Sequence, residues 1–94
     1  MEIVWRAAAV DDLDSAYVYI AENNPRAADR LRSRIMTSVG RLAMLPNLGR
    51  PGRVDGTREL VVPNTPYIVA YTLIADQVMV LSVMHSSRRW PERF

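Results

Sequence analysis

The sequence predicts an α+β fold in which a helical hairpin packs on one face of a small, mostly antiparallel sheet. Three observations predict it. A short strand-like segment opens the chain, two helix-like segments separated by a proline break follow, and three apolar β-type runs separated by turn residues come last. The expected element order is β-α-α-β-β-β, and a chain of 94 residues is expected to form one domain, residues 1–94.

The N-terminal half is expected to form one strand and the two helices. Residues 1–6 alternate in the manner of a strand, and residues 7–23 and 26–45 have apolar side chains at the helical period. The break at Asn23-Asn24-Pro25 is short, which predicts an antiparallel hairpin whose second helix begins near Pro25. The two apolar stripes are Val10, Leu13, Tyr17 and Ile20 in the first helix, and Ala28, Leu31, Ile35, Val39 and Leu42 in the second.

The C-terminal half is expected to form the rest of the sheet. The run VMVLSVM is apolar on both faces, which is typical of a central strand. The preceding strand, YIVAYTLI, has no polar face either, so the tail, a second copy or another chain must cover the second face of the sheet. In order, we expect a loop (46–56), a strand (57–62), a turn (63–66), a strand (67–74), a turn (75–77), a strand (78–84) and a polar, aromatic tail (85–94).

Composition excludes several classes of chemistry. The chain has no cysteine, so disulfides and thiolate zinc sites are absent, and all 12 basic residues are arginine. Nothing in the sequence indicates a metal site, a cofactor or a nucleotide-binding loop. We expect no secretory signal and no membrane segment, and therefore a cytoplasmic protein. The net charge of +2 is too small to indicate specific DNA binding.

Four segments, in this order, resemble the RelE/ParE superfamily of bacterial type II toxins. They are AVDDLDSAYVYIAENNPRAADRL, GRPGRVDGTREL, VVPNTPYIVAY and VMHSSRRWP, and together they span nearly the whole chain. The resemblance implies a RelE/ParE-like fold and a toxin that acts in plasmid or chromosome stability. It also implies a cognate antitoxin, expected to be a ParD-like ribbon-helix-helix protein that forms a hetero-oligomer with the toxin.

The superfamily has two branches with different targets. RelE-like members cut mRNA on the ribosome, whereas ParE-like members inhibit DNA gyrase. The position that matches an arginine of the RelE-like active site is Ile68, which can neither transfer a proton nor neutralise a phosphate. We therefore expect the ParE-like branch, a gyrase poison that acts by binding and has no catalytic residues. The alternative is a ribosome-dependent endoribonuclease that uses His85, Arg58 and Glu59, and a third hypothesis is a non-toxic module that only titrates an antitoxin.

Two sets of residues are expected to contact partners. The arginines of the glycine-rich loop and of the tail are candidates for the target surface, although the loop is equally well interpreted as a solvated turn. Trp90 is expected to fold back onto the sheet, and His85 to cap a strand end. Tyr19 lies on a different helix face from Tyr17 and is the better candidate for partner contact. The target candidates are Arg50, Arg53, Arg58, Arg88, Arg89 and Trp90, and the antitoxin candidates are Leu13, Tyr17, Tyr19, Ile20, Leu31 and Ile35.

Overall fold

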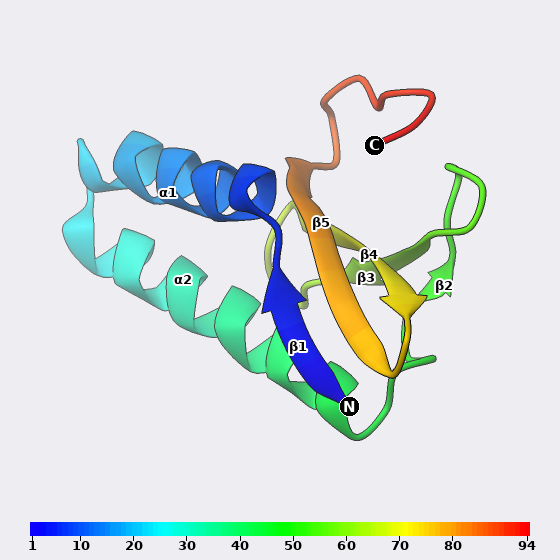
Figure 1. Ribbon diagram of the computed structural model, residues 1–94. Helices are drawn as coiled ribbons and strands as arrows, with labels where there is room; N and C mark the ends of the chain where they lie inside the picture. Colours follow the sequence, from blue (N-terminus) through cyan, green and yellow to red (C-terminus); the bar gives the residue numbers. More distant parts are fainter.

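A five-stranded mixed sheet with a helical hairpin on one face forms the fold, as the computed structural model of residues 1–94 shows (Figure 1). The strand order is β1-β5-β4-β3-β2; β1 runs parallel to β5, and the other pairs are antiparallel. This confirms the expected α+β fold. The elements are β1 (Glu2–Trp5), α1 (Ala7–Ala21), α2 (Pro25–Gly40), a 3-10 turn η1 (Arg41–Ala43), β2 (Arg50–Pro51), β3 (Arg58–Val61), β4 (Tyr67–Ile74) and β5 (Gln77–His85).

The helices begin where the sequence places the break. The Asn24 side chain accepts a hydrogen bond from the amide of Ala27 at 3.1 Å, and Pro25 occupies the first turn of α2, so both features start this helix. All apolar members of the predicted second stripe are buried, but the helix ends at Gly40 and not at Leu45, so that Leu42 lies in η1. The predicted stripe of α1 is wrong at Val10, which is 40% exposed; Ala9 takes its place in the core, since small side chains let the helix approach the sheet closely.

The main core lies between the hairpin and the sheet. Leu13 from α1 and Ile35 from α2 meet Val69 and Tyr71 of β4 and Val80 of β5 in one cluster of buried side chains. Side chains alternate along a strand, so the even-numbered neighbours of Val69 and Tyr71 point to the opposite face. Every residue of β4 from Ile68 to Tyr71 is nevertheless buried, which means that both faces of the sheet are covered.

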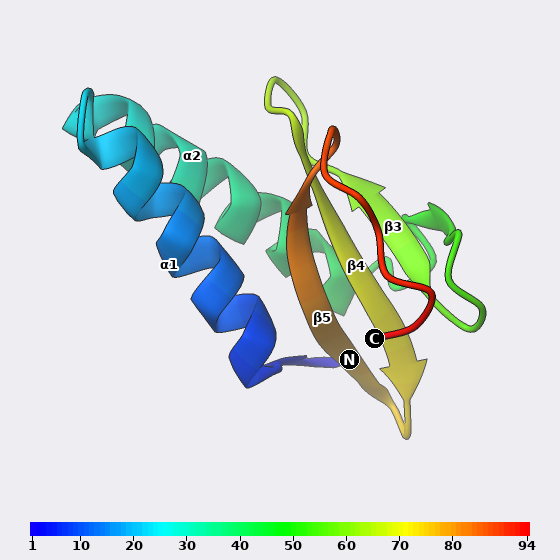
Figure 2. The same ribbon diagram turned by 90° about the horizontal axis from the view of Figure 1, so that it is seen from above.

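The C-terminal tail covers the second face. After β5 the chain turns back and runs across β4, as the red segment of Figure 2 shows. This face carries Ile68, Ala70 and Met84, which are all buried and all outside the main cluster. The sequence allowed three ways to cover this face: the tail, a second copy or another chain. In the isolated chain it is the tail that covers it.

The segment expected to be only a loop contains the short strand β2. Arg50 pairs with Glu59 and Pro51 pairs with Arg58. Gly49 permits this close approach, because a Cβ atom there would lie 2.7 Å from the Tyr71 ring. The Tyr71 hydroxyl accepts a hydrogen bond from the Gly49 amide at 2.9 Å and donates one to the Pro46 carbonyl at 2.7 Å, so it anchors the loop from the core.

Neither helix has the length and apolar character needed to cross a membrane.

Candidate functional site

A groove follows the line where the helical hairpin meets the sheet. It consists of four depressions of about 510, 320, 320 and 310 Å³, and each shares lining residues with the next. Tyr19, Tyr67 and His85 join the first two, Arg34 and Asn64 join the second and third, and Ser38, Arg41 and Pro63 join the last two. We call the part around Tyr19, Tyr67 and His85 the aromatic end, and the part around Arg34, Arg41 and Arg50 the basic end.

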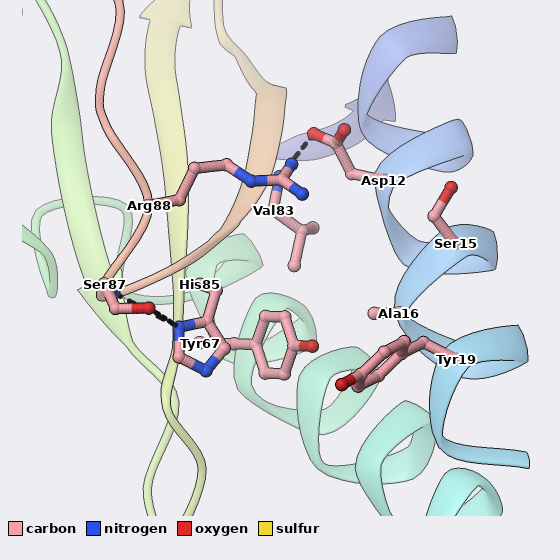
Figure 3. Close-up of a pocket in the computed structure, with 9 residues that line it drawn as sticks. All are labelled: Asp12, Ser15, Ala16, Tyr19, Tyr67, Val83, His85, Ser87 and Arg88. Carbon is pink, nitrogen blue, oxygen red and sulfur yellow. Dashed lines mark hydrogen bonds between the residues drawn. The ribbon is translucent and has the colours of Figure 1, made fainter.

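The aromatic end is built on the paired ends of β4 and β5. Tyr67 pairs with His85, and their rings meet edge to face with centroids 5.4 Å apart (Figure 3). Burial raises the pKa of Tyr67, an effect that Arg88 opposes and Tyr19 reinforces. Tyr67 therefore keeps its hydroxyl proton at neutral pH, while Tyr19 on α1 is 75% exposed on the opposite wall.

His85 is held by the turn that follows β5. Its Nδ1 accepts a hydrogen bond from the Ser87 amide at 3.1 Å and lies 2.7 Å from the Ser87 hydroxyl. A backbone amide can only donate, so in the neutral ring the proton must be on Nε2. The expectation that His85 caps a strand end with backbone hydrogen bonds agrees with this geometry.

Asp12 is the one acidic residue that lines the first depression, and its carboxylate is already engaged. Oδ2 accepts hydrogen bonds from the Ser82 hydroxyl at 2.6 Å and from the Val83 amide at 3.0 Å. Nearby, Arg6 Nε donates to the Leu81 carbonyl at 3.2 Å. Both contacts lie where β5 extends beyond its pairing with β1. They satisfy backbone groups on the free edge of β5 and hold α1 against the sheet.

The arginines of the glycine-rich loop surround a buried carboxylate. Glu59 is 3% exposed and accepts bonds from Arg50 Nη2 at 3.1 Å, from Arg53 Nε at 3.2 Å and from the Arg53 amide at 2.7 Å. Burial alone would raise the pKa of Glu59, but the bonds from Arg53 and Arg50 outweigh it, and the pKa is lowered. Arg58 Nη1 donates to the Gly49 carbonyl at 2.7 Å. These three arginines therefore hold the loop in a defined conformation. A turn that is only solvated would not need these contacts.

The tail joins this cluster through Trp90. The guanidinium of Arg53 lies 3.9 Å from the centroid of the Trp90 ring, and Phe94 meets the same ring edge to face. Trp90 therefore packs on the loop and the end of the tail, and its indole Nε1 is buried without a hydrogen-bond partner. Arg88 and Arg89 are exposed, and Arg88 also lines the groove.

His85, Arg58 and Glu59, the residues named for the nuclease alternative, are not brought together by the sheet. Cross-strand partners share a face of the sheet, so Glu59, paired with Ala70, lies on the face under the tail. His85, paired with Tyr67, lies on the helix face. The two side chains therefore cannot act on one reacting group. Ile68 is buried under the tail, as its apolar character requires.

The residues expected to contact the antitoxin divide into two groups. Leu13, Leu31 and Ile35 belong to the core, and of these only Leu31, which is 7% exposed, also lines the groove. Tyr17 and Ile20 are half-buried, and the Tyr17 hydroxyl donates to Asp29 at 2.7 Å. Tyr19 and Ile20 both line the groove, and Tyr19, 75% exposed, is the most accessible member of the set.

Sequence reasoning missed the basic end of the groove. Arg34 lies on α2 and Arg41, seven residues later, begins η1 at the end of that helix, which places both on one side. That spacing, off the apolar stripe, was the available signal. Tyr67 was also missed, because nothing local shows that a strand residue will face helix α1.

The fold is thus a two-layer α+β domain with a groove between the helical hairpin and the sheet. The sequence model of the ParE toxins of parDE type II toxin–antitoxin systems matches residues 3–90. The chain therefore belongs to the ParE toxin family, within the RelE/ParE superfamily.

Individual relatives agree with this membership. The toxin Y4kP of Sinorhizobium fredii is 44% identical over 90 residues, which cover 96% of this chain and 93% of Y4kP. The toxin RelE2 of Caulobacter vibrioides is 31% identical over 87 residues, which cover 93% and 97% of the two chains. A solved structure of the chromosomal ParDE system of P. aeruginosa superposes with a TM-score of 0.84 at 25% identity, and covers 90% of this chain and 95% of the other.

Proposed function

We propose that this toxin binds DNA gyrase and poisons it, so that cleaved DNA persists and growth stops. The observation that carries the proposal is the separation of His85 from Glu59 on opposite faces of the sheet, which leaves the pair named for RNA cleavage unassembled. A target of this kind places the toxin in the cytoplasm, where it serves plasmid or chromosome stability.

The target surface is the junction of the loop and the tail. Arg53 and Trp90 stack there, and the side chains of Arg50 and Arg53 remain about half exposed beside the exposed Arg88 and Arg89. Exposed arginine next to an aromatic ring is the composition enriched at interface hot spots. Arg58 is directed to the loop backbone and contributes by shaping this surface.

A ParD-type antitoxin neutralises the toxin by filling the groove. The solved relative is described as a ParDE toxin–antitoxin system, which supports a partner of this class. Tyr19, Tyr67 and the half-buried Ile20 offer an apolar and aromatic lining at one end, suited to an amphipathic helix. The partner forms a hetero-oligomer with the toxin through this surface.

Gyrase assays with matched variants test the proposal. Purified wild-type chain should inhibit supercoiling and accumulate cleaved DNA in proportion to its concentration. Arg89→Glu, in the exposed tail, should weaken both effects about tenfold, because one lost charged contact at an interface is worth about 1.4 kcal/mol. Arg26→Glu, which reverses an exposed arginine at the start of α2, should leave both effects unchanged. Gyrase activity that is unaffected over a wide range of toxin concentrations would refute the proposal.

The alternative is ribosome-dependent mRNA cleavage, because two similar proteins of Caulobacter vibrioides are named RelE. Ribosome-bound mRNA would then be cut in the A site, and His85→Ala would abolish both cleavage and toxicity. Intact mRNA beside accumulated cleaved DNA favours gyrase, and the reverse result favours the nuclease.

A further inference from the structure

Helix α2 concentrates positive charge on one part of the molecule. Between Pro25 and Gly40 it holds four arginines and one aspartate, a net charge of +3, whereas the whole chain has a net charge of only +2. Three of the acidic residues lie on α1 instead, at Asp11, Asp12 and Asp14. The small overall charge therefore conceals a basic surface on the second helix.

Most of these arginines form a line along the helix. At 3.6 residues per turn they fall within about 80° of one another around the axis, on the side away from the buried Ile35, and they span about 22 Å. The backbone stays helical through Gly40, so η1 continues the line. We call the exposed members of this line the arginine stripe: Arg26, Arg30, Arg34 and Arg41.

No carboxylate of the chain neutralises the arginine stripe. Both ion pairs of the chain are made to Glu59 by arginines of the glycine-rich loop. Asp29, the one acid of α2, accepts a hydrogen bond from the Tyr17 hydroxyl at 2.7 Å, on the side of the helix that faces α1. Arg34 donates to the Asn64 carbonyl at 3.2 Å, which leaves its charge unpaired. Like charges four residues apart destabilise a helix, so the stripe gains from a polyanionic partner.

The spacing of the arginine stripe suits a phosphate backbone. Arg26, Arg30 and Arg34 follow one another at steps of about 6 Å along the axis. A strand of duplex DNA carries one phosphate per about 3.4 Å of its axis, so the stripe offers about one arginine for every second phosphate. Ser33 and Thr37 lie exposed among the arginines, and their hydroxyls are further donors of the kind that bind phosphate oxygens.

The other side chains near the arginine stripe favour duplex DNA among polyanions. Proteins that bind single strands stack the bases on aromatic rings, and the stripe contains none. Double-stranded RNA is recognised through its wide minor groove and its 2′-hydroxyls, which a straight row of cations does not read. A protein partner needs an apolar anchor, but the depression beside Arg34 and Arg41 is lined by polar side chains and Pro63.

We propose that the arginine stripe binds the phosphate backbone of duplex DNA without regard to base sequence. Phosphate contacts carry no sequence information, which agrees with the expectation that this chain has no specific DNA site. The stripe is distinct from the proposed target surface, because the helical hairpin and the tail lie on opposite sides of the sheet (Figure 2). The proposal is therefore independent of the gyrase proposal.

Fluorescence anisotropy with the full chain and a labelled duplex of about 20 base pairs, which is longer than the stripe, tests the proposal. The test variant combines Arg30→Gln with Arg41→Gln, two exposed positions whose side chains hold no other element in place. The matched control combines Arg32→Gln with Arg93→Gln, which removes the same charge. Arg32 lies over the Tyr17 ring on the α1 side of the helix, 5.8 Å from its centroid, and Arg93 lies in the tail.

The dependence of affinity on salt counts the phosphate contacts. Four contacts predict a slope of about −3.6 for the logarithm of the association constant against the logarithm of the salt concentration. The test variant should bind more weakly, with a slope of about −1.8, while the control keeps the wild-type slope. A second duplex of unrelated sequence should bind wild type equally well. Thermal unfolding should be the same for both variants, because all four positions are exposed.

Each other outcome overturns the proposal. If wild type does not bind the duplex at low salt, or if the test variant keeps the wild-type slope, the arginine stripe is not a DNA surface. Equal losses in the test variant and the control would mean that only the net charge matters. If polyglutamate displaces the labelled duplex at a lower phosphate-equivalent charge than unlabelled duplex does, the stripe serves an acidic protein instead. Inhibition of gyrase by the test variant is a separate measurement and should match that of wild type.

Discussion

Glu59 and Tyr71 are the two residues whose polar atoms connect the core to the loop. The Glu59 carboxylate gathers the Arg50 and Arg53 side chains and the Arg53 amide, and the Tyr71 hydroxyl holds the backbone at Pro46 and Gly49. Both side chains are buried, so removal of either leaves polar groups without partners. The order of the loop, and with it the target surface, depends on these two side chains.

Glu59→Gln should lower the free energy of unfolding by about 2 kcal/mol at pH 7, because charge-assisted bonds to two arginines are lost. The folded-state pKa of Glu59 lies below its ordinary value of 4.5. The stabilisation is therefore fully present above about pH 4.5, and it disappears as the pH falls through the folded-state pKa. Urea unfolding at a series of pH values should show wild type and Glu59→Gln converging in acid. A difference that stays constant from neutral to acidic pH would contradict this account.

Tyr71→Phe should lower the free energy of unfolding by about 1–3 kcal/mol, because the Gly49 amide would be buried without an acceptor. Tyr19→Phe is the matched control, since the Tyr19 side chain is 75% exposed. Chemical denaturation of both variants checks the prediction. Equal stability of the two variants would show that the Tyr71 hydroxyl does not anchor the loop.

The tail is the element that completes the sheet. Its path over β4 buries the face that carries Ile68, Ala70 and Met84, and its main fastening is the stack of Trp90 on Arg53 (Figure 2). An exposed apolar face of this kind would favour association with other chains. The tail therefore acts as a cover for the sheet and as part of the proposed target surface.

Trp90→Ala should loosen the tail and expose this face. A double-mutant cycle with Arg53→Ala should give a coupling energy of about 0.5–2 kcal/mol, the range for a partly desolvated cation–π pair. Binding of a hydrophobic dye should rise in Trp90→Ala. The control is Arg93→Ala, at an exposed tail residue, which should bind dye as wild type does. Trp5→Ala would not serve as a control, because Trp5 packs on the main core. Zero coupling would mean that the stack does not fasten the tail.

At the scale of the whole molecule, the groove joins surfaces that come from α1, α2, β3 and the ends of β4 and β5. It exists only while the hairpin is packed on the sheet. A partner that fills it therefore binds the folded state and not the unfolded chain.

The isolated toxin should unfold at a lower temperature than its complex with the antitoxin. With antitoxin at 100 times its dissociation constant, the gain is about 2.7 kcal/mol. Tyr19→Ala should reduce affinity about tenfold or more while leaving the unfolding of the free chain unchanged, because its ring is exposed in the groove. Leu31→Ala, in the core, should instead destabilise the free chain by about 2–5 kcal/mol. Calorimetry of free and bound forms separates the two effects, and a Tyr19→Ala variant that binds normally would place the antitoxin elsewhere.

Local sequence was enough to predict the elements and their class. The Asn24-Pro25 start of α2, the stripe from Ala28 to Leu42 and the turn at 63–66 rest on interactions between near neighbours in the chain. The short strand β2 was not predictable in the same way, because it depends on Glu59 and Tyr71 folding against Gly49 and Arg50.

Tertiary structure alone decided which residues share a site. Local pattern grouped His85, Arg58 and Glu59, but strand pairing puts His85 and Glu59 on opposite faces. It also brings Arg53 to Trp90, and Asp12 to Val83, across long separations in the chain. Periodicity shows which side chains share a face of one element, but only strand register and helix docking determine which elements those faces meet. The family and fold were therefore predictable from the sequence, whereas the groove arose from packing.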